Sequence, residues 1–590
     1  MKTPLIFLST CLFCSTTNAA ANFDISPTPG TTLPTKVPLG SQVSASYTIT
    51  NLTQSTRSGY RITGLPSTAS QNTDAGNCPK SIKLGAKESC ILILDIAGEA
   101  SSNFALCHGA TCTSASVPLN VRVTNALSGL PSIAVGQYDD ESGVLKPMLA
   151  LSNGNISTWI YPSEVSNPQL SPALSSRGRL IGGDCLDSTC IAVGRYDSSN
   201  IDGIPMLALT KDSGNSWTFP TAITIPNTSP EFRDNGRLEG ASCSGNTCIA
   251  SGSYVAIDSV QRPLLALSTN LGSTWTFPEA VTEPTTISPA FSGRGQLFKA
   301  SCYDSTCISS GLYQDINGVL RSLVSLTTDG GATWTFPADI TNFTIANLSS
   351  SSLAGAECTD LACLASGTYV DTSAIQRPLL AVSVDNGSSW TFPTDITNPT
   401  TTPPLVGRGT LYSVSCSGTL CIAVGRYHDS NDDRRPLLGV SNDTGSTWTF
   451  PESITNPTTL PDFASGSLFS ASCSDAICIA SGEYFDSSSN RYPLIAQSTD
   501  RGITWTYVSE VITPDTTPPY SASGILFGAS CSGNSCIASG YYEDGSGLVR
   551  PLLAVTDNAG SSWTFPDSIT EADGLPAFQS AVFNDAGVQN

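Results

Sequence analysis

The sequence is poor in several residue types on which enzymes often depend. Of its 590 residues, two are histidine and three are methionine, and only 13% are charged. With only His108 and His428, histidine-based zinc catalysis and a Ser-His-Asp triad have little support. Basic residues are scarce too, because 27 Lys and Arg stand against 48 Asp and Glu, for a net charge of -21. A negative field repels phosphate backbones, so nucleic acid is not an expected partner.

Long apolar runs are absent beyond the first residues. Lys2, an apolar run at 4–13 and small residues up to 21 form the pattern of a secretory signal, so residues 1–21 are a predicted signal peptide. No later stretch approaches the ~20 apolar residues of a spanning helix, so we expect no membrane span and a secreted or periplasmic protein. Long helical periodicity is also missing, whereas Gly, Ser, Thr, Asn and Pro abound, which predicts an all-β chain.

Cysteine, in contrast, is plentiful. Twenty cysteines, less Cys11 and Cys14 of the signal, leave eighteen, an even number in a chain bound for an oxidising compartment. Seven pairs recur at C-x4-C spacing, and local pairing is favoured for the other four as well. The predicted disulfides are Cys78–Cys90, Cys107–Cys112, Cys185–Cys190, Cys243–Cys248, Cys302–Cys307, Cys358–Cys363, Cys416–Cys421, Cys473–Cys478 and Cys531–Cys536. Zinc binding is the competing interpretation, but these pairs lie a whole repeat apart.

All eight tryptophans lie in one repeated context, 56 to 59 residues apart. They are Trp159, Trp217, Trp275, Trp334, Trp390, Trp448, Trp505 and Trp563. A period of this size with strand-like content predicts an eight-bladed β-propeller in residues 127–590. In the sixth repeat, turn residues separate four predicted strands, at 411–417, 421–427, 436–441 and 447–450.

The ends of the repeat region predict how the ring closes. Residues 132–138 match the second strand of later repeats and have no first strand before them, whereas 582–588 fall where a first strand is due. The C-terminal strand is therefore predicted to complete the first blade, which leaves no unpaired edge. Ser132 and Val588 would then occupy the two cysteine positions. Residues 22–125 lack the repeat, and their alternating apolar runs predict a small immunoglobulin-like β-sandwich.

A turn near each tryptophan has a recognisable signature. Residues 441–448, Ser-Asn-Asp-Thr-Gly-Ser-Thr-Trp, resemble the Asp-box (BNR repeat), S-x-D-x-G-x-x-W, of sialidases, sortilin-like receptors and photosystem II assembly factors. The resemblance implies a hairpin turn between third and fourth strands, on the face away from the active site. An acidic or amide residue that recurs in nearly every blade is needed by the blade itself, so we expect a structural role for it. The corresponding residues are Asp212, Asn270, Asp329, Asp385, Asp443, Asp500 and Asn558.

Another periodic pair lies on the opposite face. Second strands end in Gly-x-Tyr, and in most repeats a basic residue follows eight positions after the tyrosine. The candidate pairs are Tyr254 with Arg262, Tyr313 with Arg321, Tyr369 with Arg377, Tyr427 with Arg435 and Tyr542 with Arg550. Two interpretations stay open, a cross-hairpin Tyr/Arg/Asp network and a polar rim that binds a ligand. The acidic turn 429–433 offers oxygens for calcium without the twelve-residue loop pattern, and no other cofactor is expected.

The resemblance to sialidases implies a demanding active site. Such an enzyme needs a tyrosine nucleophile with a glutamate partner, an acidic aspartate and three arginines from different blades, and the sequence shows no such non-repeating set. We therefore assign no catalytic residue and leave activity open. The favoured function is a monomeric, non-catalytic binding or scaffold protein that recognises a glycan or protein through the propeller loop face. The alternatives are a sialidase-like glycoside hydrolase and a periplasmic assembly factor.

Overall fold

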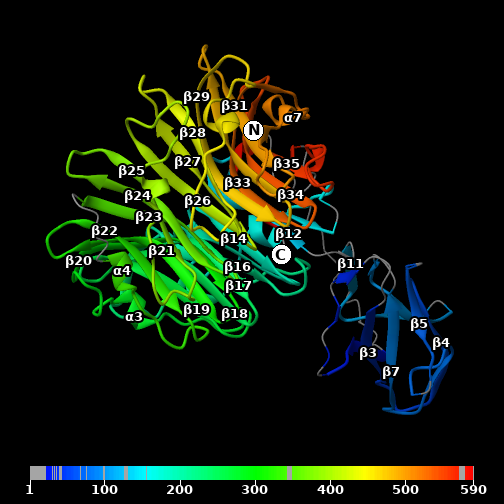
Figure 1. Cartoon of the computed structure of the whole chain (residues 1–590). Helices are drawn as coiled ribbons and strands as arrows, with labels where there is room; N and C mark the ends of the chain where they lie inside the picture. Colours follow the sequence, from blue (N-terminus) through cyan, green and yellow to red (C-terminus); the bar gives the residue numbers. More distant parts are fainter. Residues whose placement is uncertain are drawn as a thin grey trace, which may run out of the picture. The chain divides into compact units, whose positions relative to one another are not determined.

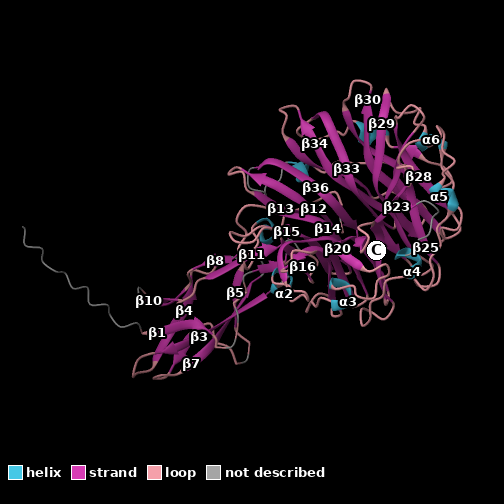
Figure 2. Cartoon of the chain, turned by 90° about the vertical axis from the view of Figure 1, so that its left-hand side faces the viewer, coloured by secondary structure: helices cyan, strands magenta, loops and turns pink. Residues whose placement is uncertain are grey.

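The computed structural model describes residues 22–29, 31, 33–34, 36–38, 43–66, 68–74, 76–96, 100–109, 111–124, 131–154, 156–341, 348–570 and 578–588. The predicted signal peptide at 1–21 and the predicted domain boundary at 125–127 lie outside these ranges. The chain divides into two compact units, Met1–Leu127 and Ser128–Asn590, and strands dominate both (Figures 1 and 2). No helix in the described part of the chain is long and apolar enough to cross a membrane.

The first unit is built from two four-stranded antiparallel sheets, β1-β3-β7-β5 and β10-β9-β4-β6, and a three-stranded sheet, β2-β11-β8. Its strands are β1 (Phe23–Pro27), β2 (Lys36–Pro38), β3 (Val43–Asn51), β4 (Arg57–Thr63), β5 (Ala69–Asn72), β6 (Ile82–Leu84), β7 (Ser89–Ile96), β8 (Ala100–Ser102), β9 (Ala105–His108), β10 (Thr111–Ser114) and β11 (Leu119–Thr124). The alternating apolar residues of β3 and β7 turn to one side and enter a shared core, where the rings of Tyr47 and Phe104 meet edge to face with centroids 5.0 Å apart.

The second unit repeats a small antiparallel sheet, in which the middle strand pairs with a strand on each side. The strands are β12 (Pro131–Asp140), β13 (Leu145–Asn153), β14 (Gly178–Leu186), β15 (Thr189–Tyr196), β16 (Ile204–Thr210), β17 (Phe232–Ser244), β18 (Thr247–Ala256), β19 (Gln261–Ser268), β20 (Phe291–Tyr303), β21 (Thr306–Asp315), β22 (Leu320–Thr327), β23 (Leu348–Cys358), β24 (Cys363–Asp371), β25 (Gln376–Ser383), β26 (Gly409–Ser417), β27 (Leu420–His428), β28 (Arg434–Ser441), β29 (Phe463–Ser474), β30 (Ile477–Asp486), β31 (Arg491–Ser498), β32 (Thr506–Tyr507), β33 (Tyr520–Ser532), β34 (Ser535–Asp544), β35 (Val549–Thr556) and β36 (Phe578–Val588). Figure 1 shows these sheets side by side in chain order, as repeated blades of a propeller are arranged.

One sheet of this unit contains strands from both of its ends. The last strand, β36, pairs antiparallel with β12, from Ser132↔Val588 to Asp140↔Phe578. A register irregularity follows Val135 in this pairing, and the equivalent irregularity recurs in the sheets that are continuous in sequence. The Phe583 side chain of β36 is fully buried in a core between neighbouring sheets. β36 thus takes the place of a first strand.

The glycine of each Gly-x-Tyr segment is explained by this irregularity. Opposite Gly425, the first strand β26 contains an extra residue, which brings its backbone unusually close to the second strand. A Cβ atom at Gly425 would lie 1.9 Å from the carbonyl oxygen of Thr410. Only glycine fits where two backbones approach so closely.

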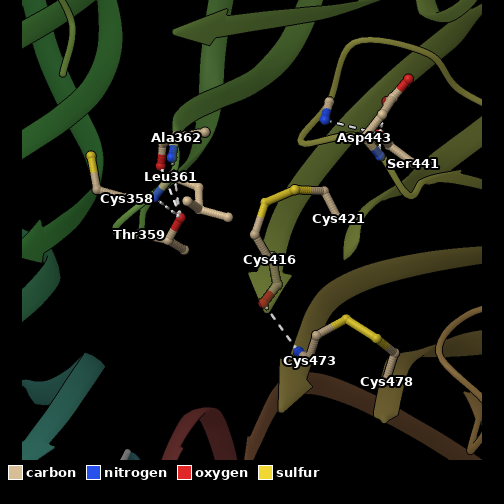
Figure 3. The surroundings of a disulfide bond; sticks show 12 residues. Cys358, Thr359, Leu361, Ala362, Cys416, Cys421, Ser441, Asp443, Cys473 and Cys478 are labelled. Carbon is tan, nitrogen blue, oxygen red and sulfur yellow. Dashed lines mark hydrogen bonds between the residues drawn. A yellow bond between two sulfur atoms is a disulfide. The ribbon is translucent and has the colours of Figure 1, made fainter. Parts of the chain in front are cut away.

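The structure contains nine disulfides, in the pairs that the spacing indicated. Cys416 and Cys421 lie directly opposite each other across the hairpin of β26 and β27. Figure 3 shows this bond beside the equivalent Cys473–Cys478. Nine disulfides are typical of a protein of an oxidising, extracytoplasmic compartment.

The fourth strand of each repeat is much shorter than the sequence predicted. In the sixth repeat, the segment 447–450 contributes one antiparallel bridge, Val440↔Thr449. Pro451 follows directly, and because it has no N–H to donate to a ladder, the chain turns there into a short helix. The equivalent helices are α1 (Ser163–Ser166), α2 (Thr221–Thr224), α3 (Glu279–Thr282), α4 (Ala338–Thr341), α5 (Thr394–Thr397), α6 (Glu452–Thr455), α7 (Ser509–Ile512) and α8 (Asp567–Thr570).

Candidate functional site

The periodic tyrosines are interior residues of their hairpins. Tyr427 and Arg435 are direct partners in the β27–β28 ladder. The Tyr427 ring is fully buried, and its hydroxyl donates a hydrogen bond of 2.9 Å to the carbonyl oxygen of Pro403. Burial raises the pKa of Tyr427 to about 12. The same cross-strand pairing holds for Tyr254 and Arg262, Tyr313 and Arg321, Tyr369 and Arg377, and Tyr542 and Arg550. Rings buried in this way have no face left for a ligand.

The arginine partners are held by the acidic turns between second and third strands. Arg435 Nε donates to Asp429 at 3.0 Å, and the backbone N–H groups of Asn431 and Asp433 donate to the same carboxylate at 2.9 and 3.1 Å. Burial alone would raise the pKa of Asp429, but these donors and the guanidinium lower it below its usual value. The equivalent ion pairs are Arg321–Asp315, Arg377–Asp371 and Arg550–Asp544. Arg262 pairs instead with Asp258, a different residue of its turn. These contacts form a repeated cross-hairpin network that stabilises the hairpins.

The carboxylates of the acidic turn 429–433, which could offer oxygens to calcium, bind groups of the turn itself. Asp429 caps the turn as described, and Asp432 lies 2.9 Å from Nδ1 of His428. Among the residues that the structure describes, no group of three or more His, Cys, Asp or Glu side chains could hold a metal ion. The other histidine, His108, packs on the ring of Tyr60 with centroids 5.3 Å apart.

The acidic residues of the tryptophan-linked turns also act within their own turn. The Asp443 carboxylate accepts hydrogen bonds of 2.8 Å from the Ser441 hydroxyl and 2.8 Å from the Thr447 N–H (Figure 3). Gly445 adopts a φ of +84°, and its carbonyl accepts the indole N–H of the buried Trp448 at 2.8 Å. Side-chain oxygens make equivalent contacts at Asp212, Asn270, Asp329, Asp385, Asp500 and Asn558. Such contacts fix the turn.

A different set of charged side chains does not repeat. The middle residue of the Gly-x-Tyr segment is Arg426, Glu483 and Tyr541 in three successive sheets. Glu483 is only 4% exposed and accepts hydrogen bonds from Nη2 of Arg434, at 3.4 Å, and from Nε of Arg491. Arg491 also donates to the Tyr541 hydroxyl at 2.6 Å. We name Arg426, Arg434 and Arg491 the arginine cluster. It lies where second strands end and third strands begin.

Aromatic faces support each guanidinium of the arginine cluster. The Phe485 ring lies 5.2 Å from the guanidinium carbon of Arg434 and 5.8 Å from that of Arg491. Arg426 lies over the Tyr412 ring at 5.8 Å. Stacking of this kind fixes the plane of a guanidinium while its edge stays open to hydrogen bonds. Burial lowers the pKa of Arg434, against the attraction of Glu483.

None of the three arginines of the arginine cluster is among the candidate residues that the sequence indicated. The sequence candidates were the repeated tyrosines, whereas Arg426, Glu483 and Tyr541 each lie one residue before such a tyrosine. Variation at that position, from Arg426 to Glu483 to Tyr541, is the signal that could have found the cluster. Residues that differ between repeats are those that the repeat does not need.

A cavity of about 670 Å³ is also present in the second unit, lined by first strands of the sheets. It reaches from the disulfide hairpins to the rings of Tyr412, Phe469 and Phe527. Its charged residues include Lys299 and Glu357, which the sequence analysis did not single out.

No protein-family model and no curated protein matches the chain. Among solved structures, a Trypanosoma rangeli sialidase in complex with the inhibitor DANA is 12% identical with a TM-score of 0.35, and the match covers 62% of this chain and 57% of that one. The Hadza microbial sialidase Hz136 is 10% identical with a TM-score of 0.32, over 87% of this chain and 96% of that one. The β-propeller domain of the Trilobed protease from Pyrococcus furiosus is 8% identical with a TM-score of 0.35, over 66% of this chain and 98% of that one. At these identities and TM-scores, no residue role or activity follows from the similarity.

Proposed function

We propose that the chain is a secreted, non-catalytic binding protein. In this proposal residues 1–21 are a signal peptide, 22–125 an immunoglobulin-like sandwich and 127–590 an eight-bladed Asp-box propeller, which β36 closes within the first blade. The protein acts as a monomer in the periplasm or outside the cell. Its ligand is a glycan or a protein, bound by the loops that join second and third strands.

The arginine cluster is the observation that carries this proposal. Two of its guanidiniums, those of Arg434 and Arg491, pair with one carboxylate, that of Glu483. Arg426 adds a third positive charge, so the cluster keeps an excess of positive charge within a chain of net charge -21. Arginine forks match carboxylate groups bidentately, and their stacking on aromatic rings reduces the entropy lost on binding. The cluster therefore favours a ligand with carboxylate or other anionic groups, such as an acidic glycan or an acidic protein surface.

Replacing Arg434 with alanine is expected to weaken ligand binding at least tenfold, because partly buried, ring-stacked arginines are frequent hot spots of binding. The measurement is a glycan array with the recombinant mature protein, followed by titration of the best ligand. Arg501→Ala is the matched control, because Arg501 is exposed on a turn of the other face and makes the same change in charge. Equal binding by the Arg434→Ala variant and the unchanged protein would remove the cluster from the proposed interface.

The contacts of the arginine cluster with Glu483 and Tyr541 suggest a second candidate function, a sialidase-like glycoside hydrolase, because such a site combines arginine, glutamate and tyrosine. The hydrogen bonds argue against it. Glu483 is held by two guanidiniums, and within the described residues no tyrosine hydroxyl donates to its carboxylate. A glutamate so occupied is poorly placed to activate a tyrosine nucleophile.

We therefore expect no release of sialic acid from fluorogenic sialosides at a rate above the buffer blank. The assay needs the purified mature protein and a known sialidase as positive control. Turnover that disappears in a Tyr541→Phe variant would favour the hydrolase instead.

A further inference from the structure

The first strands that line the cavity share a common register, set by the first cysteine of each disulfide. One residue before this cysteine, serine hydroxyls link neighbouring sheets. Their Oγ atoms accept the backbone N–H of the cysteine in the next sheet, at 2.9 to 3.1 Å. The serines concerned are Ser242, Ser301, Ser415 and Ser472. A contact that recurs between sheets is structural.

Acidic residues replace serine at this position in two sheets. Asp184 keeps the serine's role, because its carboxylate accepts the Cys243 N–H at 2.8 Å. Glu357 does not, and within the described part of the chain no hydrogen bond or ion pair reaches its carboxylate. Burial raises the pKa of Glu357 to about 8, against the attraction of Lys299 and together with the repulsion of Asp184. Glu357 therefore lines the cavity with a carboxyl group that the fold does not use.

Two more charged residues line the cavity three residues before the cysteine position. Most sheets have a small residue there, namely Gly182, Gly240, Gly355, Ser413, Ser470 and Gly528. Lys299 and Asp585 take this position in the two remaining sheets, and their charged groups lie 3.3 Å apart. Asp585 raises the pKa of Lys299. The ion-pair partner of Lys299 is thus Asp585, and its attraction for Glu357 does not offset the effect of burial on that carboxyl group.

Aromatic side chains face the cavity from other sheets. Tyr412, Phe469 and Phe527 lie four residues before the cysteine of β26, β29 and β33, with ring centroids 5.8 and 6.0 Å apart between neighbours. The cavity thus has charged residues from β14, β20, β23 and β36 and a run of rings from three consecutive sheets. Its acidic lining residues are Asp184, Glu239, Glu357, Asp360, Asp475 and Asp585, against the single lysine Lys299.

We propose that this cavity binds a small organic ammonium ion that carries a flat apolar face. Acidic residues outnumber the single lysine in this lining, an imbalance that favours cations, and carboxylate with aromatic rings is the combination that recognises organic ammonium groups. An ammonium group beside Glu357 stabilises its ionised form, while the flat face stacks on the rings of Tyr412, Phe469 and Phe527. A bare metal ion fits less well, because no described group of three suitable side chains could hold one. The cavity meets the arginine cluster at the Tyr412 ring, over which Arg426 lies, but the uncharged and ammonium probes that test this site carry no anionic group, so its test is separate from that of the proposed function.

Calorimetric titration of the full mature chain with three probes tests the proposal. Phenethylamine has both the ammonium and the flat face, phenethyl alcohol lacks the charge, and n-butylamine lacks the ring. We expect phenethylamine to bind at least tenfold more tightly than either. Equal affinity for phenethyl alcohol or for n-butylamine, or no binding of phenethylamine at millimolar concentration, would each overturn the proposal.

The Glu357→Gln variant tests whether the Glu357 carboxylate causes the preference for the ammonium probe. It is expected to lose the tenfold preference for phenethylamine over phenethyl alcohol, whereas Glu452→Gln, the same change on the exposed face of α6, keeps it. A folded Glu357→Gln protein, checked by its circular dichroism spectrum, that retains the preference would contradict the assignment.

The pH dependence supplies an independent readout. The charged and titratable groups around Glu357 are Lys299, Asp184 and, on the neighbouring strand, Tyr412. Since the pKa of Glu357 is about 8, it holds a proton at pH 6.5 that ammonium binding must release. Affinity for phenethylamine should therefore rise between pH 6.5 and 8.5 in the unchanged chain and stay level in Glu357→Gln. A level profile in the unchanged chain would overturn the proposal.

Discussion

A chain that lacks residues 576–590 is expected to aggregate during purification or to be cut rapidly by protease. The deletion removes β36, which pairs with β12 along nearly its whole length. It leaves the backbone groups of β12 without partners and bares strand edges. It also removes the fully buried Phe583 and the partner of Lys299. The loss of stability should exceed the ~0.5 to 3 kcal/mol of an ordinary point substitution.

Limited proteolysis and thermal melting of the truncated and intact proteins provide the measurement. Phe583→Ala keeps the strand and removes only its buried ring, so it should lose about 3 to 5 kcal/mol and remain folded. Deletion of residues 589 and 590 alone, which lie beyond β36, is the matched control. A truncated chain that melts at the same temperature as the intact one would show that β36 is dispensable.

The features that the sequence predicts well are those that repeat. The spacing of tryptophans and cysteines requires only that one structural unit recur, and the partial repeats at the two ends indicate which strands must pair. The hydrogen bonds of Asp443 follow for the same reason, because a turn that recurs with one spacing has one geometry. The prediction of a fourth strand at 447–450 is wrong, because Pro451 follows directly and pairing ends after a single bridge.

The cavity and the arginine cluster could not be predicted in this way, because they depend on residues that differ between repeats. Lys299 and Asp585 are 286 residues apart, and they meet only because β20 and β36 have the same register relative to their second strands. An irregularity between Leu297 and Lys299 also leaves Phe298 without a partner opposite. It breaks the two-residue alternation by which buried and exposed positions of a strand are told apart. Such contacts become visible only when the backbone path is known.

The double substitution of Ser132→Cys and Val588→Cys is expected to form a tenth disulfide and to raise the free energy of unfolding by about 4 to 5 kcal/mol. Ser132 and Val588 are Cα partners in the β12–β36 ladder, as Cys190 and Cys185 are in the next sheet, where a disulfide joins them with Cα atoms 4.1 Å apart. The native hairpin bonds close short loops and contribute only about 2 kcal/mol each by loop-closure entropy. The new bond would close a loop of nearly the whole second unit, and the entropic gain grows with loop length.

The melting temperature of the double variant, measured before and after reduction, shows the size of this gain. The Ser132→Cys single variant is the matched control, because it makes the same change in β12 without a partner thiol. The double variant should resist unfolding from its C-terminal end, so the same bond should slow proteolysis near β36. Two thiols that react with an alkylating reagent under native, oxidising conditions would mean that the chain ends do not meet at this register. If the bond forms but the melting temperature does not rise, unfolding begins elsewhere than at the seam between β12 and β36.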